Sequence, residues 1–295
     1  MDTVTDQKGE HSAAGSAGSD RVALVTGTSS GIGEAVAREL AAAGFRVFGT
    51  TRSAPAQPID GVEPLTVDVD DDRSVRDGVE RVLREAGRID VLVNNAGYLC
   101  EGAVEEVTIA EAKAQFETNY FGVVRMTDAV LPGMRARGGG HIITLSSLAG
   151  LVPVPFWGHY NASKFAVEGL METLRHEVRP FGIRVAMVEP GNIRTQLYAR
   201  PHPDRMDVYA GPRGRAFATM DEFGRKAPGP DVVARKVAAI AADPHPALRN
   251  KLTREATQFT MLRWLLPGGA FEAGVRRGFK LVGKDDSAQP QGSAA

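Results

Sequence analysis

The feature that most restricts the fold is a glycine-rich turn between a strand pattern and a helix pattern. Val22-Ala23-Leu24-Val25 is a short apolar run typical of a buried strand. The turn covers residues 26–33 (Thr-Gly-Thr-Ser-Ser-Gly-Ile-Gly), and a helical pattern follows over 34–43. A second strand pattern covers 46–51. Strand, turn, helix and strand in this order predict the start of a parallel sheet with helical crossovers.

The glycines of this turn suit the binding of a dinucleotide. Gly27 allows a tight turn, Gly31 lets the backbone approach a pyrophosphate, and Gly33 permits close packing of helix on strand. The phosphates would lie at the helix N-terminus, where free N–H groups and the helix dipole favour negative charge. A plain helix-capping turn is the alternative, which the flanking strands disfavour. The predicted contacts are Gly27, Thr28, Ser29, Ser30, Gly31, Ile32 and Gly33.

The end of the second strand pattern indicates which dinucleotide is bound. An NAD site usually places an acidic residue there, where it holds the ribose 2′-hydroxyl. This chain has no carboxylate at that point, and Arg52 follows the strand directly. A guanidinium can hold a 2′-phosphate with two hydrogen bonds. The sequence therefore favours NADP(H), with NAD(H) as the alternative if Arg52 is only a solvated surface residue.

The alternation of strand and helix patterns continues to about residue 190. Further strands are predicted at 65–67, 89–93, 141–145 and 183–188, and helices at 71–86, 105–117, 119–137, from Tyr160 to about 180, and 230–242. Alternation of this kind predicts an α/β fold, a doubly wound (Rossmann-type) parallel sheet with helices on both faces in three layers. Asp68 and Val69 follow the third strand and are predicted cofactor contacts, of which Asp68 could accept a hydrogen bond from an adenine amino group.

Composition limits the domain organisation and the classes of partner. The 295 residues fit one domain over 21–283, with polar tails at 1–20 and 284–295 that we expect to be disordered. The first tail has no apolar segment of a signal peptide. A net charge of −1 gives no argument for nucleic acid. The single cysteine, Cys100, excludes an intrachain disulfide and fits a reducing cytoplasm, and the histidine spacing gives no zinc signature, so no metal is expected.

Tyr160 and Lys164 are spaced to lie on one face of a helix, four residues apart. A free tyrosine has a pKa near ~10, and a neighbouring ammonium stabilises the phenolate. Ser147, thirteen residues upstream, could hydrogen-bond the same substrate oxygen. Since Tyr-x-x-x-Lys is also a frequent accident on helix surfaces, the pair alone does not establish catalysis.

Taken together, the motifs resemble those of the short-chain dehydrogenase/reductase family over residues 21–195. The matching residues are Thr26-Gly27-x-x-x-Gly31-x-Gly33, Asn94-Asn95-Ala96-Gly97, Asn119, Ser147, Tyr160-x-x-x-Lys164 and Pro190-Gly191-x-x-x-Thr195. One motif alone is weak, but six in this order and spacing are specific.

The resemblance implies a role for each matching residue. Tyr160 would be the general acid/base, Lys164 would lower its pKa and bind the nicotinamide ribose, and Ser147 would orient the substrate oxygen. Asn119 would hold a water molecule of a proton relay. The remaining cofactor contacts implied are Asn95, Ala96 and Gly97 on the adenosine side, and Pro190, Gly191, Ile193 and Thr195 at the nicotinamide.

The substrate side of the chain is rich in apolar residues. Segments 98–104, 148–158 and 196–225 should frame the substrate, the last as a long loop suited to a mobile lid. Apolar walls favour a bulky hydrophobic alcohol or ketone. The alternative is that these residues pack against one another or against a partner subunit.

The last hundred residues depart from shorter family members. Residues 248–252 are too polar to predict a seventh strand, and the apolar patch 259–266 is too short to span a bilayer. The patch could lie in a membrane interface, cover the substrate pocket or join a subunit contact, and packing in the core or pocket is the favoured interpretation.

The sequence thus predicts a cytoplasmic NADP(H)-dependent oxidoreductase that interconverts a secondary alcohol and a ketone. An NAD-linked enzyme and a non-catalytic dinucleotide sensor are the alternatives. The resemblance also implies a homodimer or homotetramer formed through helices 119–137 and 160–180.

Overall fold

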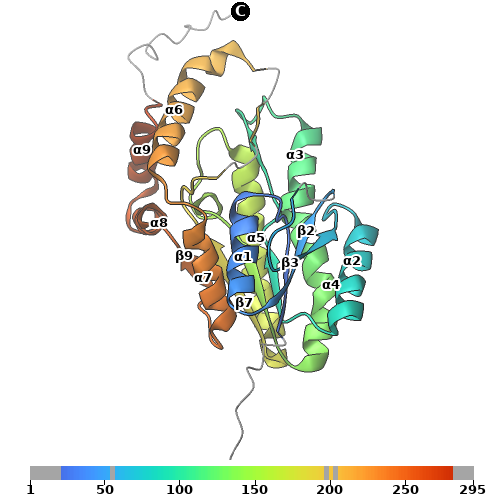
Figure 1. The fold of residues 1–295 in the computed structure, drawn as a ribbon. Helices are drawn as coiled ribbons and strands as arrows, with labels where there is room; N and C mark the ends of the chain where they lie inside the picture. Colours follow the sequence, from blue (N-terminus) through green and yellow to red (C-terminus); the bar gives the residue numbers. More distant parts are fainter. Residues whose placement is uncertain (1–20, 54–56, 196–198, 202–204, 282–295) are drawn as a thin grey trace, which may run out of the picture.

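A seven-stranded parallel sheet forms the centre of the computed structural model, which describes residues 21–53, 57–195, 199–201 and 205–281 (Figure 1). The predicted tails 1–20 and 284–295 lie outside these residues. The strand order is β3-β2-β1-β4-β6-β7-β9. The strands are β1 Val22–Val25, β2 Arg46–Thr51, β3 Val62–Thr66, β4 Val91–Asn94, β6 Gly140–Leu145, β7 Ile183–Glu189 and β9 Arg249–Lys251.

Helices cover both faces of the sheet, as predicted. One face packs against α2 (Asp72–Ala86), α4 (Gly122–Arg137) and α5 (Gly158–Val178), and the other against α1 (Gly31–Ala42) and α7 (Asp231–Ala242). Strand β1 shows why: Val22 and Leu24 point into one apolar cluster and Ala23 and Val25 into the other. Side chains alternate across a strand, so a strand buried on both faces is apolar throughout.

Local signals in the sequence mark the helix ends. Asp71 caps α2 by accepting from Ser74 N at 2.6 Å, and Gly87 ends that helix in the left-handed conformation. Thr108 and Glu111 form a capping box at the start of α3 (Ile109–Phe116). The predicted helix 119–137 begins instead as a π-helical turn, Glu117–Phe121, that continues into α4.

Two expectations for the C-terminal part are wrong. Residues 249–251 form the edge strand β9, paired with Met187–Glu189 of β7, although their polar sequence did not predict a strand. The expected loop 196–225 contains α6 (Ala210–Lys226), which begins in spite of Gly211 and Pro212. Residues 196–198 and 202–204 of that segment lie outside the described residues. The chain then forms α8 (Arg254–Leu265) and α9 (Gly268–Gly278).

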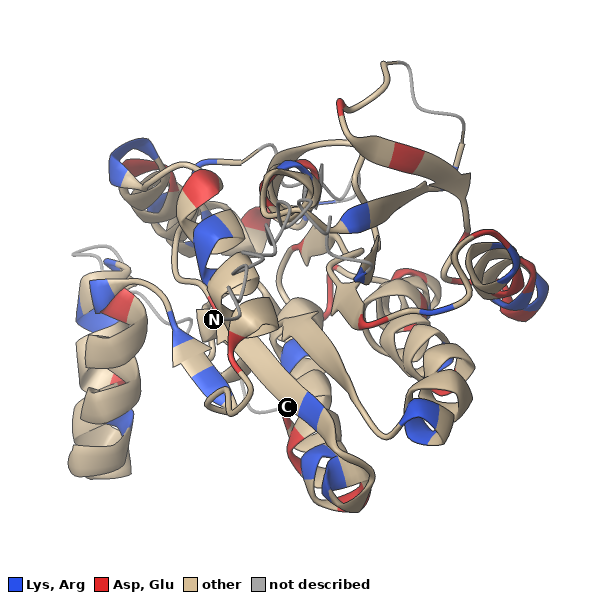
Figure 2. Cartoon of the chain, turned by 60° about the horizontal axis from the view of Figure 1, so that its bottom comes forward, with Lys and Arg blue, Asp and Glu red and all other residues tan. Residues whose placement is uncertain are grey.

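Charged residues of both signs lie mainly on the helices and loops around a largely uncharged sheet (Figure 2). A small second sheet pairs β5 (Leu99–Glu101) with β8 (Ala199–Pro201). Cys100 is buried in β5, as expected of a small apolar residue. Among the described residues, no helix has the length and apolarity required to cross a membrane. In the same part of the chain, no group of three or more His, Cys, Asp or Glu side chains is arranged to hold a metal ion.

Candidate active site

The glycine turn after β1 is packed so closely that larger residues do not fit. Gly27 and Gly31 have φ angles of 70° and 62°, in the left-handed region that favours glycine. A Cβ on Gly33 would lie 2.1 Å from the Gly27 carbonyl oxygen and 2.4 Å from Asn95 Nδ2. The turn therefore presents bare backbone at the N-terminus of α1, the arrangement that binds a pyrophosphate.

The loop after β4 holds this turn in place. Asn95 Nδ2 donates to the carbonyl oxygens of Thr26 and Gly27, at 2.9 and 3.0 Å. Thr26 Oγ1 in turn accepts from the backbone N–H groups of Asn95 and Ala96, at 2.9 and 3.0 Å. Asn95 thus stabilises the turn through its side chain. Thr26, which appears in the sequence only as part of the glycine motif, fixes the loop after β4 to the turn.

A cavity of about 260 Å³ runs along the carboxyl ends of the strands from the glycine turn to Tyr160; we call it the glycine-turn cavity. Exposed Arg52 lines it at the end of β2, where the sequence analysis expects a 2′-phosphate. Thr28 does not line this cavity; it is buried and its Oγ1 donates to Thr50 O at 3.2 Å. The predicted residues that do line it are Gly27, Ser29, Ser30, Gly31, Ile32, Gly33, Arg52, Val69, Asn95, Ala96, Gly97, Tyr160, Lys164, Pro190 and Thr195.

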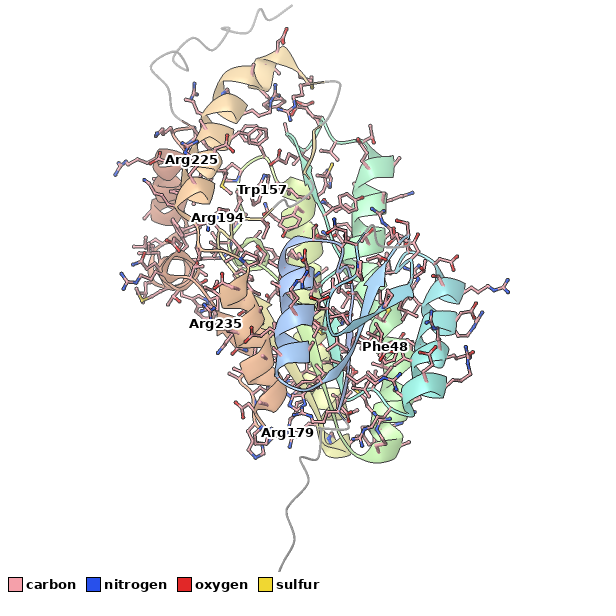
Figure 3. The ribbon with its side chains drawn as sticks, viewed as in Figure 1. Phe48, Trp157, Arg179, Arg194, Arg225 and Arg235 are labelled. Carbon is pink, nitrogen blue, oxygen red and sulfur yellow. The ribbon has the colours of Figure 1, made fainter. Side chains whose placement is uncertain are left out.

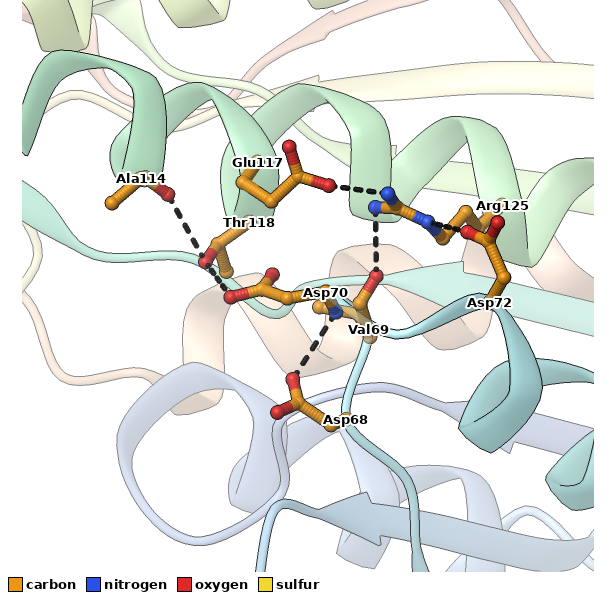
Figure 4. Close-up of polar contacts among 8 residues, drawn as sticks. All are labelled: Asp68, Val69, Asp70, Asp72, Ala114, Glu117, Thr118 and Arg125. Atoms are coloured by element: carbon orange, nitrogen blue, oxygen red, sulfur yellow. Dashed lines mark hydrogen bonds and ion pairs between the residues drawn. The ribbon is translucent and has the colours of Figure 1, made fainter. Parts of the chain in front are cut away.

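The loop after β3 is tied to the helices beside it by a polar network (Figure 4). Asp70 accepts from Thr118 Oγ1 at 2.8 Å, and Arg125 binds Asp72, Glu117 and the carbonyl oxygen of Val69. Thr118, which the sequence analysis did not single out, lines the glycine-turn cavity together with Val69.

Asp68 does not line this cavity. Its Oδ1 accepts from Asp70 N at 3.1 Å, so one oxygen is used within the loop. Its contact with adenine stays a prediction.

Tyr160, Lys164 and Ser147 come together as the resemblance implies. Ser147 follows β6, and its hydroxyl accepts from Ala149 N at 3.1 Å. The same hydroxyl is close enough to the Tyr160 hydroxyl to affect its pKa. Lys164 lies one helical turn after Tyr160, and its Nζ donates to the carbonyl oxygen of Leu145 at 2.8 Å. The ammonium is 5.8 Å from the centroid of the Tyr160 ring. Both side chains are 7% exposed.

Burial sets the pKa values of this pair. It raises the pKa of Tyr160 to about 12, and the neighbouring Ser147 hydroxyl offsets only part of that effect. Burial also lowers the pKa of Lys164 to about 8, although Glu168 opposes this. The expected lowering of the tyrosine pKa by its lysine neighbour is thus not found in this structure, because loss of hydration disfavours the charged form of each group. A pKa of about 12 keeps the phenol protonated at neutral pH.

Asn119 is completely buried beside this pair in the π-helical turn. Its Oδ1 accepts from Tyr98 N at 3.0 Å, and its Nδ2 donates to Tyr98 O and Ser163 Oγ at 3.0 and 3.2 Å. Ser163 Oγ donates to Tyr160 O, which links Asn119 to α5. Asn119 lines neither cavity, and its role in a water relay stays a prediction.

A buried charge cluster, Glu168, Glu189 and Arg249, lies one turn beyond Lys164. Glu168 pairs with Arg249, whose Nη1 is also 3.7 Å from Glu189 Oε1. Glu189 is fully buried, and burial together with the charge of Glu168 raises its pKa to about 8. No local pattern in the sequence indicates this cluster, since its members come from α5, β7 and β9.

A second cavity of about 630 Å³, the apolar cavity, meets the first at Tyr160. Ser147 lines it, as do Pro190, Gly191, Ile193 and Thr195 of the loop after β7. Trp157, Arg194 and Arg225 line it between the sheet and α6 (Figure 3). The charged side chains in its wall are Glu101, Arg194, Asp221, Arg225 and Glu255. Burial raises the pKa of Glu101.

Helices α8 and α9 form part of the wall of the apolar cavity, through Phe259, Val275 and Phe279. The favoured interpretation of the patch 259–266 therefore holds for Phe259. It is wrong for residues 261–266, which are all exposed.

Comparison with known proteins identifies the family. The family model for short chain dehydrogenases matches residues 21–205. The chain belongs to the short-chain dehydrogenase family. Members of this family among its relatives include a 3-ketodihydrosphingosine reductase of Bacteroides thetaiotaomicron, 40% identical over 79% of this chain and 87% of the relative. The human 17-beta-hydroxysteroid dehydrogenase type 1 is 34% identical over 84% of this chain and 82% of the relative.

Solved structures of short-chain dehydrogenases share the fold. One from Streptomyces avermitilis has a TM-score of 0.76 and 35% identity, over 88% of this chain and 97% of the other. A metagenomic short-chain oxidoreductase in complex with NADP has a TM-score of 0.62 and 30% identity, over 80% and 96%. A 3-ketoacyl-(acyl-carrier-protein) reductase from Brucella melitensis complexed with NADH has a TM-score of 0.66 and 25% identity, over 79% and 96%. The chain is an oxidoreductase of this family, with the Rossmann-type sheet that the sequence predicts.

Proposed function

We propose that this short-chain dehydrogenase is an NADP(H)-dependent reductase of bulky hydrophobic ketones, with Tyr160 as the general acid. The observation that carries the proposal is the position of Tyr160, which lies near Ser147 and lines both the glycine-turn cavity and the apolar cavity where they meet. A substrate oxygen placed there has two hydroxyl groups within reach, which would hold and polarise it.

The glycine-turn cavity suits two of the phosphate groups of NADP. The glycine backbone, which a Cβ on Gly33 would obstruct, suits the pyrophosphate, and Arg52 suits a 2′-phosphate. Bound NADPH would supply a hydride to the substrate carbon. The NADP complex of the metagenomic relative supports this choice, and the NADH complex of the Brucella relative keeps the NAD-linked alternative open.

The chain's own residues would supply the proton and its surroundings. Tyr160 transfers its hydroxyl proton to the carbonyl oxygen, which becomes the alcohol as the carbon gains the hydride. The Tyr160 phenol carries its proton at neutral pH, as a general acid must before it acts. Lys164, fixed on Leu145 O, is placed to stabilise the phenolate that remains.

The size and lining of the apolar cavity support a large, mainly hydrophobic substrate. The cavity holds about 630 Å³ and combines apolar walls with a few charged groups. Two relatives are named for large substrates of this kind, 3-ketodihydrosphingosine and a 17-beta-hydroxysteroid. Assembly of two or four copies through α4 and α5, and a cytoplasmic location, stay predictions.

The test is reduction of a ketone panel by NADPH, followed at 340 nm. The panel contains 3-ketodihydrosphingosine, a 17-ketosteroid and a small water-soluble ketone. Tyr160→Phe should lower kcat at least ~100-fold, within the usual range for loss of a general acid. Tyr120→Phe, the same change on a ring that lines neither cavity, is the control.

Normal turnover by Tyr160→Phe would exclude this mechanism. Tight NADPH binding without turnover of any ketone would favour the dinucleotide sensor instead.

A further inference from the structure

An exposed apolar surface lies on α8 and the turn that follows it. From residue 261 to residue 270 every side chain is exposed. Trp264 is 86% and Leu265 70% exposed. Five of the twelve large apolar side chains that are exposed in the described part of the chain lie within residues 261–266. We call these five the C-terminal apolar surface: Met261, Leu262, Trp264, Leu265 and Leu266.

The helices that carry this surface, α8 and α9, are rich in exposed basic residues. Between residues 254 and 280 the chain has five basic and two acidic residues, a net charge of +3 in a protein whose net charge is −1. All five basic side chains are exposed: Arg254, Arg263, Arg276, Arg277 and Lys280. Exposed apolar side chains and exposed cations on the same two helices match the interface of an anionic bilayer, where the rings of Trp enter the headgroup region and Arg and Lys meet phosphates.

The same two helices form a wall of the apolar cavity. Phe259 of α8, Val275 of α9 and the following Phe279 line it, while the C-terminal apolar surface lies on the outside. In Figure 1, α8 and α9 lie on the side of the molecule opposite α2 and α4. A water-insoluble substrate concentrates in a bilayer, so a surface that docks there would bring the cavity wall next to the substrate.

We propose that α8 and α9 dock this protein reversibly on anionic lipid bilayers through the C-terminal apolar surface. A second copy of the chain is the competing occupant. A twofold contact would bring the positive charges of one copy next to those of the other, which costs free energy, whereas anionic lipid neutralises them. The charge pattern therefore favours lipid.

The experiment is co-sedimentation of the full chain with vesicles. One set is phosphatidylcholine alone and the other contains 30 mol% phosphatidylglycerol. We expect half-maximal binding at a lipid concentration at least tenfold lower for the anionic vesicles than for the neutral ones. Binding to the anionic vesicles should weaken as the salt concentration is raised. Trp264→Glu with Leu265→Glu should abolish binding to both. Ile109→Glu, the same kind of change on an isolated exposed side chain of α3, should leave it unchanged.

A second double variant separates the charge from the apolar side chains. Arg276→Gln with Arg277→Gln should reduce binding to anionic vesicles severalfold and leave the weak binding to neutral vesicles unchanged. Reduction of the water-soluble ketone should stay normal in all of these variants, so failure of vesicle binding and failure of the proposed chemistry are distinguishable.

Two results would overturn the proposal. If the wild type does not sediment with either kind of vesicle, the surface does not dock on lipid. If, in addition, Trp264→Glu with Leu265→Glu lowers the molar mass measured by light scattering, the surface is a contact between copies of the chain.

Discussion

The walls of the two cavities are stabilised by different kinds of contact. Around the glycine-turn cavity, each face of the sheet carries a continuous apolar cluster, and the turn itself is fixed by backbone contacts and the Asn95 amide. Around the outer wall of the apolar cavity, α8 buries only Ala256 and Thr260, and α9 buries no side chain.

Polar contacts replace a core in that outer wall. Arg213 of α6 forms a buried ion pair with Glu106, and Arg215 donates to the carbonyl oxygens of Lys280 and Leu281 at 2.7 and 3.3 Å. The difference indicates that the chemistry is held by close packing, whereas the substrate side depends on a few directional contacts that can change with little effect on the rest.

The strongest test of this contrast is a Gly→Ala substitution beside each cavity, at Gly33 and at Gly214. Gly33→Ala places a methyl group 2.1 Å from Gly27 O, a distance that real Cβ atoms do not show. We expect the affinity for NADPH to fall by at least about 100-fold, because the turn must open, and the melting temperature to fall as well. Isothermal titration and thermal denaturation measure the two effects.

Gly214→Ala is the matched control in the substrate half. Gly214 is exposed in α6 and its Cβ would meet nothing within 4 Å. Alanine should stabilise the helix by about 0.5–1 kcal/mol and leave NADPH binding unchanged. Affinity of Gly33→Ala within threefold of the wild type would contradict the role given to the turn.

Arg52→Ala tests a polar contact within the glycine-turn half. A charged hydrogen-bonding group contributes about 1.5–3 kcal/mol, so the KM for NADPH should rise about 10- to 100-fold. The KM for NADH should stay the same, because NADH has no 2′-phosphate. Arg38→Ala, in an exposed pair with Glu34 on α1, should change neither value. Equal losses with both cofactors would show that Arg52 does not select NADP(H).

The same contrast explains which features of the structure could be predicted from the sequence. Apolar runs such as 22–25 and the glycine spacing at 27, 31 and 33 are local patterns, so six strands and the turn were predictable. Ser147, Tyr160 and Lys164 were predictable as a motif, but their pKa values were not, because burial depends on the whole fold.

The C-terminal part was harder to predict because its polar residues have distant partners. Arg249 in β9 pairs with Glu168 of α5, and Asn250 Nδ2 donates to Met187 O at 3.0 Å. These contacts give partners to the polar side chains of β9, whose local sequence is too polar to predict a strand. Helix α6 was not predicted, because Gly211 and Pro212 near its start are unfavourable in a helix. Its buried ion pair, Arg213 with Glu106, joins residues far apart in the sequence and could not be predicted from local patterns.

Glu189, the last residue of β7, should make stability depend on pH. Its pKa is about 8 in the folded chain and near its ordinary 4.5 when unfolded. Between these values the folded chain keeps a proton that the unfolded chain has lost, so the free energy of unfolding should fall as pH rises from 4.5 to 8. Each pKa unit corresponds to about 1.4 kcal/mol, which predicts a change of a few kcal/mol.

Urea denaturation at pH 5, 6, 7 and 8 measures this dependence. Glu189→Gln should flatten the pH profile of the unfolding free energy, because the amide does not ionise. Glu172→Gln removes an exposed carboxylate partner of the same Arg249 and should leave the slope intact. A slope unchanged in Glu189→Gln would mean that another group causes it.

The smallest effect is expected from a tether in the substrate half. Arg215→Leu removes the two hydrogen bonds that join α6 to the end of α9, each of which contributes about 1 kcal/mol. Because Phe279 lines the apolar cavity just before that contact, the KM for a hydrophobic ketone should rise about two- to fivefold. The KM for NADPH and the melting temperature should change little, since neither apolar cluster on the sheet includes α6 or α9. Steady-state kinetics with each substrate varied in turn measures the split, and an equal rise in both KM values would show that the two halves are mechanically coupled rather than separately held.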